Sequence, residues 1–175
     1  QARYRMDAEF VRDTALHVSG LLSDEIGGRS VKPYQPAGYW QHLNFPRRSW
    51  KASQGRDLYR RSLYTFVCRS FPHPAMVAFD APSREECTAE RPRSNIPQQA
   101  LVLLNDPVFV EAARAFGERI VRENKDDTAR IKWAFGEVLT RKPTPNETTI
   151  LAKLLATQKA RYQNDEASAK ALLAT

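Results

Sequence analysis

The sequence has little of what cofactors, metals and covalent catalysis require. Its 175 residues include two cysteines and three histidines, and no Cys-x-x-Cys-His motif that would attach a haem. His17, His42 and His73 lack the spacing of metal ligands. Neither a Gly-x-Ser-x-Gly motif nor a Gly-rich phosphate loop is present. We therefore predict that the chain binds no cofactor or metal of its own and holds no catalytic residue, and we do not expect an enzyme.

Long hydrophobic runs are also missing. No stretch approaches the roughly 20 apolar residues of a membrane-spanning helix, and no secretory signal opens the chain at Gln1. Because no initiator methionine is present, we expect a piece of a longer protein. With 42% hydrophobic and 27% charged residues, the composition is typical of a globular protein. The length predicts one domain over residues 1–175, large enough to bury a core.

The two cysteines, Cys68 and Cys87, have a spacing that does not decide their state. They suit two small buried apolar side chains. A disulfide and a reactive thiol are the alternatives.

The most informative stretch runs from Phe79 to Val121. Ser83 and Glu86 have the spacing of a capping box, which predicts a helix start. A short apolar run over residues 98–104 ends at Asp106 and Pro107, which suit the cap and the first position of a new helix. That helix has one apolar face, formed by Phe109, Ala112, Ala113, Phe116 and Ile120.

Three further helices are predicted by capping residues and helical periodicity. The first begins after Asp7 and ends at Gly27–Gly28. Its expected buried face is Val11, Thr14, Ala15, Val18, Leu21 and Leu22. Another covers residues 128–141, and the last begins at a second capping box formed by Thr144 and Glu147. The predicted fold is mainly α, a single-domain bundle of about five helices.

Between the first two predicted helices the pattern is irregular. Residues 28–50 contain repeated Gly and Pro and predict a long aromatic-rich loop, with Tyr34, Tyr39, Trp40 and Trp50 packed down onto the protein. Alternatively, these rings form a stacking platform for sugars or bases. The alternation after Leu63 predicts at most a short β-hairpin, turning at Pro72–Pro74 and ending at Phe79.

The net charge of +7 is concentrated in one segment. Between Arg47 and Arg69 seven basic residues face the single acid Asp57. This excess makes the segment a candidate surface for anions or sugars. The candidate residues are Trp40, Arg47, Arg48, Trp50, Arg60 and Arg61.

The loop after Phe79 mixes arginines with carboxylates, which predicts an ion-pair and hydrogen-bond network with a structural role. The alternative is an anion-binding surface. Its predicted members are Asp80, Ser83, Arg84, Glu86, Arg91, Arg93 and Asp106.

Four blocks of the sequence resemble one family in order, between about Arg5 and Arg161. The blocks are RMDAEFVRD, YRRSLYTF, FDAPSREECT and SNIPQQALVLLNDPVFVEAA. The family is domain of unknown function 1553, a planctomycete-specific domain at the C-terminal end of secreted proteins that also carry c-type cytochrome domains. One departure is ERPRSNIPQQAL, where members more often read RRxRTNTPLQAL, so Ser94, Ile96 and Gln98 replace Thr, Thr and Leu.

The resemblance implies a C-terminal position in a multidomain, extracytoplasmic protein whose haem c sits in other domains, and it implies no activity. Three hypotheses follow. The chain is a non-catalytic interaction module for other domains of the same polypeptide. Alternatively, its basic segment binds an acidic polysaccharide, sulfated or uronic, rather than nucleic acid. The last alternative is an enzyme that acts on such a polysaccharide.

Overall fold

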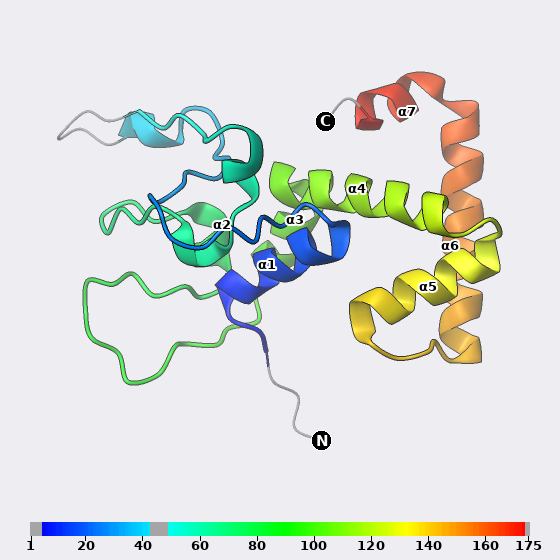
Figure 1. Cartoon of the computed structure of the whole chain (residues 1–175), viewed down its shortest axis with the longest axis horizontal. Coiled ribbons are helices and arrows are strands. Elements are labelled where there is room, and N and C mark those ends of the chain that lie inside the picture. Colours follow the sequence, from blue (N-terminus) through cyan, green and yellow to red (C-terminus); the bar gives the residue numbers. More distant parts are fainter. Residues whose placement is uncertain (1–4, 43–48, 174–175) are drawn as a thin grey trace. The chain divides into compact units, whose positions relative to one another are not determined.

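The computed structural model describes residues 5–42 and 49–173, and within these ranges the protein is mainly helical (Figure 1). The α-helices are α1 (Ala8–Ser19), α2 (Pro74–Ala78), α3 (Pro97–Asn105), α4 (Pro107–Glu123), α5 (Asp127–Leu139), α6 (Pro145–Asn164) and α7 (Glu166–Leu173). Short 3-10 helices cover Tyr39–His42, Gly55–Tyr59 and Ser62–Tyr64. The predicted helical fold class is confirmed.

The chain divides into two compact units, Gln1–Ala112 (unit 1) and Ala113–Thr175 (unit 2). The boundary falls inside the α4 segment of the sequence. One domain over residues 1–175 stays a prediction.

Helix α1 ends earlier than predicted and buries a different face. Gly20 adopts a left-handed φ of 81° and its N–H bonds the carbonyls of Leu16 and His17, which closes the helix before Gly27–Gly28 is reached. The buried residues are Ala8, Arg12, Leu16 and Ser19. The predicted face is therefore only partly right: Val11 packs against the core, but Arg12 occupies the centre of the buried face.

The segment predicted as a β-hairpin forms no hairpin. Residues 62–64 make a 3-10 turn, and Pro74 starts α2, where its missing N–H costs nothing. Thr65 instead forms an isolated parallel bridge with Val31, and across it the Phe66 N–H donates to the Val31 carbonyl at 2.7 Å. Since both alternating sets of side chains in this segment are apolar, the sequence pattern suited a strand, although no adjacent strand is present in the described residues.

The core of unit 1 lies where α1 and α3 pack on α2. Ala8, Met76 and Phe79 form the buried centre, and Val11 and Val102 pack against it. α1 also contacts the 3-10 turn at residues 62–64. This contact brings the buried arginine of α1 onto the loops.

The aromatic-rich loop is packed down at Tyr39, Trp40 and Trp50, as predicted, whereas Tyr34 is exposed. Trp40 stacks on Trp50 with ring centroids 5.2 Å apart, and Phe71 lies 5.3 Å from Trp40. The indole N–H of Trp50 donates to the Pro33 carbonyl at 2.8 Å, and that of Trp40 donates to Gln35. A satisfied indole donor and a ring on each side are the features of a core aromatic.

Two buried arginines hold the loops of unit 1 together. Arg12 donates to the carbonyls of Leu58 and Arg60, both at 2.8 Å. Arg60 donates to the carbonyl of Arg29 at 2.9 Å and to that of Gly27. Each guanidinium group therefore connects its own segment to main-chain carbonyls of a segment far away in the sequence. These side-chain hydrogen bonds do what main-chain hydrogen bonds between strands do in a sheet.

In the stretch from Phe79 to Val121, the predicted helix break before Pro107 is present, but the predicted helix start at Ser83 is not. No helix begins at Ser83, whose Oγ accepts only the N–H of Glu85 at 3.3 Å. Asp80 and Arg84 have φ values of 61° and 63°, and this left-handed backbone excludes a helix here. The next helix, α3, starts at Pro97 and ends at Asn105, and α4 starts at Pro107 as predicted.

Unit 2 contains two of the predicted helices with their caps. α5 is capped by Asp126, whose carboxylate accepts the Ala129 N–H at 2.9 Å. α6 begins with the complete Thr144–Glu147 capping box. α6 contacts both α5 and α7.

Candidate functional site

The predicted anion or sugar surface is not assembled as expected. Arg47 and Arg48 lie outside the described residues. Trp40 and Arg60 are buried, at 7% and 2% exposure, so neither reaches a surface ligand. Trp50 is half-buried against other rings, and Arg61 is exposed. The assignment of Trp40 and Arg60 to this surface is therefore wrong, because the aromatic packing and the loop carbonyls take up both side chains.

The predicted acid–arginine network exists in part, with partners that local sequence did not indicate. Arg91 binds Glu9 of α1 through two nitrogens, at 2.6 and 3.2 Å. Asp80 accepts the N–H and the hydroxyl of Ser94, at 2.8 and 2.7 Å, and these bonds lower the pKa of Asp80. Arg5 lies 3.4 Å from the same carboxylate.

The remaining predicted members of this network are separate. Glu86 and Arg93 are exposed and have no hydrogen bond to another described residue. Asp106 caps α4 by accepting the Val108 N–H at 2.9 Å. Burial raises the pKa of Asp106, against the opposing effect of that bond and of Arg12.

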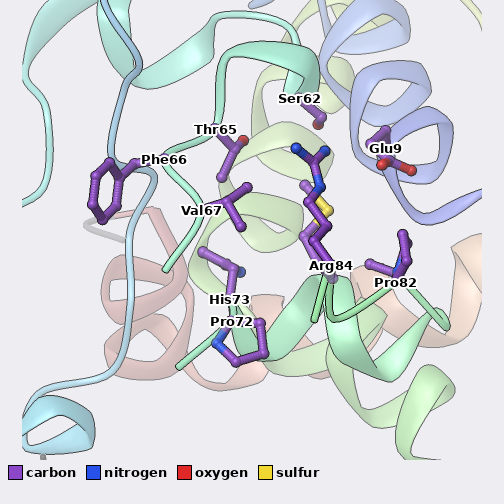
Figure 2. A pocket seen from close by; sticks show the side chains of 11 residues that line it. Glu9, Ser62, Thr65, Phe66, Val67, Pro72, His73, Pro82 and Arg84 are labelled. Carbon is purple, nitrogen blue, oxygen red and sulfur yellow. The ribbon is translucent and has the colours of Figure 1, made fainter. Parts of the chain in front are cut away.

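A small cavity in unit 1 lies under the loop that carries Arg84 (Figure 2). Its volume is about 40 Å³, enough for a few water-sized atoms. The polar lining is Glu9, Ser62, Thr65, His73 and Arg84. The apolar lining is Phe66, Val67, Pro72, Met76, Ala81 and Pro82.

His73 presents an unpartnered nitrogen at this cavity. It is 6% exposed, and its Nε2 lies 2.9 Å from the Tyr34 carbonyl, which requires an N–H at that position. Burial lowers the pKa of His73 to about 4, so the ring is neutral near pH 7. Nδ1 therefore carries a lone pair, and it is buried with no hydrogen-bond partner within the described chain.

Thr65 and Arg84 complete the polar side of the cavity. The Thr65 hydroxyl is also buried without a hydrogen-bond partner among the described residues. Figure 2 shows the Arg84 side chain reaching across the cavity, with its guanidinium towards Ser62 and Glu9. Glu9 is already bound by Arg91. Burial raises the pKa of Glu9, but the hydrogen bond from Arg91, together with the charges of Arg91 and Arg84, lowers it overall.

A much larger apolar groove lies in unit 2. It has a volume of about 610 Å³ and is lined by α5, α6 and the part of α4 that belongs to this unit. Its lining includes Phe116, Ile120, Val121, Ile131, Phe135, Val138, Leu151, Leu154 and Leu155. Three of these are largely exposed, Val121 at 60%, Leu154 at 53% and Val138 at 45%. Such a surface is unusual for a protein that functions alone.

The charged residues of this groove are engaged with one another at one end. Asp127 accepts two hydrogen bonds from Lys159, at 2.6 and 2.7 Å, and one from Arg130 at 3.1 Å. The groove therefore offers apolar contact along most of its length.

Reasoning from the sequence missed Arg12, Thr65 and His73. His73 was considered only as a metal ligand. Cys87 is an exposed free thiol, so it is not the buried apolar side chain that was predicted. In the described part of the chain, no three His, Cys, Asp or Glu side chains are grouped to hold a metal ion. None of the described helices is long and apolar enough to cross a bilayer.

The fold and these two sites define a helical module with a small polar cavity and an open apolar groove. No curated protein and no solved structure matches the chain. One family model does, over residues 1–155. The chain belongs to this family, which is described as a protein of unknown function (DUF1553).

Proposed function

We propose that the chain is a non-catalytic interaction module of a larger extracytoplasmic protein that carries c-type haem in other domains. The haem context and the compartment rest on the family resemblance. The observation that carries the docking role is the apolar groove of unit 2. The occupant we propose is an amphipathic helix from another part of the same polypeptide.

The shape and chemistry of the groove favour a helix. About 610 Å³ accommodates several large apolar side chains, which a helix presents from one face at positions i, i+3, i+4 and i+7. A polar ligand is disfavoured, because the only charged groups at the groove, at Asp127, Arg130 and Lys159, already bond one another. Apolar side chains of the occupant would cover the exposed Val121, Val138 and Leu154.

The test is a binding titration between residues 1–175 and the remainder of the full-length polypeptide. Leu154→Lys places a charge in the groove and should weaken binding at least tenfold, about 1.4 kcal/mol. Leu104→Lys is the matched control, because Leu104 is 73% exposed on α3 and does not line the groove. Both variants should keep the helical circular dichroism spectrum. Equal binding by both variants, or no binding by the unmodified chain, would overturn the docking role.

A second candidate is binding of an acidic polysaccharide through the basic segment. Lys51, Arg56, Arg61 and Arg69 are exposed, and Asp57 is the only acid among residues 49–69. Because Trp40 is buried, the attraction would be electrostatic, with little stacking on sugar rings. A heparin-like polymer should bind at low ionic strength and be released as salt rises. If neither sulfated nor uronic polymers bind at low salt, the segment has a structural role.

A further inference from the structure

We propose that the cavity formed by Thr65, His73 and Arg84 is a binding site for a carboxylate with a neighbouring hydroxyl group. Such a group occurs in free small hydroxy acids. A terminal uronic acid of a sugar chain presents a related group, in which the nearest hydroxyl is one carbon further from the carboxylate. If the ligand is an acidic sugar end, this proposal rests on the proposed binding of an acidic polysaccharide and extends it. The cavity uses none of the exposed residues of the basic segment.

The first step of the argument is the lone pair on His73. This ring nitrogen is buried and has no hydrogen-bond partner among the described residues, so it is an acceptor that a molecule in the cavity can satisfy. The opposite nitrogen lies against the Tyr34 carbonyl and fixes the tautomer, so Nδ1 acts only as an acceptor. A ligand that satisfies it has to bring a donor. A hydroxyl group does so, whereas sulfate and acetate do not.

The second step is the cation at the mouth of the cavity. Arg84 forms no hydrogen bond or ion pair with any residue in the described ranges, although its side chain reaches across the opening (Figure 2). Guanidinium groups bind carboxylates through two parallel hydrogen bonds. The neighbouring acid Glu9 is hydrogen-bonded to Arg91, at 2.6 Å, and it interacts with Arg84 only through its charge, so the donors of Arg84 are available to a ligand.

The third step is the fit of the ligand's carboxylate and hydroxyl groups within the cavity. The Thr65 hydroxyl, 9% exposed and unpartnered within the described chain, either donates to the carboxylate or accepts from the ligand hydroxyl. A volume of about 40 Å³ admits a carboxylate and an adjacent hydroxyl group, so the rest of a larger ligand would have to lie outside the opening. The apolar walls around Phe66, Val67 and Met76 remove competing water, which strengthens these polar contacts.

The site is tested by titrating the full chain at neutral pH with glycolate, glucuronate, acetate and sulfate. The ring nitrogens of His73 are followed by long-range ¹H–¹⁵N spectra. Glycolate should bind saturably in the millimolar range and shift the Nδ1 resonance of His73. Acetate and sulfate, which lack a donor, should bind at least tenfold more weakly. Binding of glucuronate as well as glycolate identifies acidic sugar ends as ligands, and binding of glycolate alone identifies small free acids.

The matched variants are Arg84→Gln and Arg93→Gln, two exposed arginines of the same loop. Arg84→Gln should weaken glycolate binding ten- to hundredfold, because a charge-assisted hydrogen bond is lost, and Arg93→Gln should not. Thr65→Val should weaken it as well. If no ligand moves the His73 resonance, the cavity holds water only and the proposal is overturned. Equal affinity for acetate and glycolate overturns it too. Neither result bears on heparin binding by the basic segment, so the two ideas fail separately.

Discussion

Replacement of the buried arginine of α1 should destabilise unit 1 strongly. The Arg12 guanidinium is 4% exposed and donates to the carbonyls of Leu58 and Arg60, both at 2.8 Å, and to the Ser62 hydroxyl at 3.3 Å. Arg12→Met keeps most of the volume and removes every donor. Hydrogen bonds from a charged group are worth about 1.5–3 kcal/mol each. Two such bonds predict a loss of about 3–6 kcal/mol, a large part of a typical free energy of unfolding.

Arg12→Lys separates charge from geometry. Lysine keeps the positive charge, but its ammonium lacks the planar fork that reaches two carbonyls at once. We expect a loss of about 1.5–3 kcal/mol, between those of the methionine variant and the unmodified chain. Burial lowers the pKa of Arg12 and would also lower that of a lysine here. Because the unfolded chain would then hold the lysine proton more tightly than the fold does, the deficit should shrink as the pH rises towards about 10.

The measurement is urea unfolding followed by tryptophan fluorescence. Arg61→Met is the control, because Arg61 lies in the same unit, loses the same charge and is exposed. It should change the free energy of unfolding by no more than about 0.5 kcal/mol. If Arg12→Met costs no more than Arg61→Met, the guanidinium does not hold the loops and the reasoning fails.

Three other predictions concern stability. The pKa of His73 is about 4 in the fold and 6.5 ordinarily, so the contribution of the neutral ring to the free energy of unfolding is complete above pH ~6.5. This free energy should fall by about 3 kcal/mol as the pH drops towards 4. In acid titrations His73→Gln should flatten this pH dependence, and an unchanged slope would contradict the prediction. Asp106→Ala should cost about 1 kcal/mol through the lost α4 cap, while Asp106→Asn, which keeps an acceptor, should cost less. If the melting temperature of Asp106→Ala equals that of the unmodified chain, the cap contributes nothing. If residues 1–175 are one cooperative domain, the unfolding transitions seen by Trp133 in unit 2 and by the tryptophans of unit 1 should coincide, and two separate transitions would refute it.

The helical class could be predicted because its signals are local. Thr144 and Glu147 specify a capping box within four residues, and Asp106 with Pro107 specifies a break that neighbouring packing does not override. Where two local signals compete, prediction fails. Ser83 and Glu86 match a capping box, but Asp80 and Arg84 adopt a left-handed backbone that stops any helix there.

The sites could not be predicted, because what defines them is three-dimensional. From the sequence alone, Arg12 is expected to be an exposed helix residue. In the structure it is buried because it donates to carbonyls of a loop far away in the sequence. Thr65, His73 and Arg84 come from three different segments of the chain. What marks the site is that the Thr65 hydroxyl and the His73 Nδ1 have no hydrogen-bond partner among the described residues. The spacing of residues along the sequence does not show whether a buried polar atom has a hydrogen-bond partner in the fold. The groove was equally hidden, since its helices read as ordinary amphipathic ones.

The arginine forks also determine which positions of unit 1 are free to change over evolution. Their acceptors are main-chain carbonyls, which every amino acid supplies. Residues at 25, 29 and 58 can therefore be exchanged without loss of the contact, provided the backbone path is kept. Arg12 and Arg60 cannot, and Gly27 and Gly28 are constrained by left-handed φ values of 84° and 83°. Across the family, we expect loops of variable sequence around two invariant arginines.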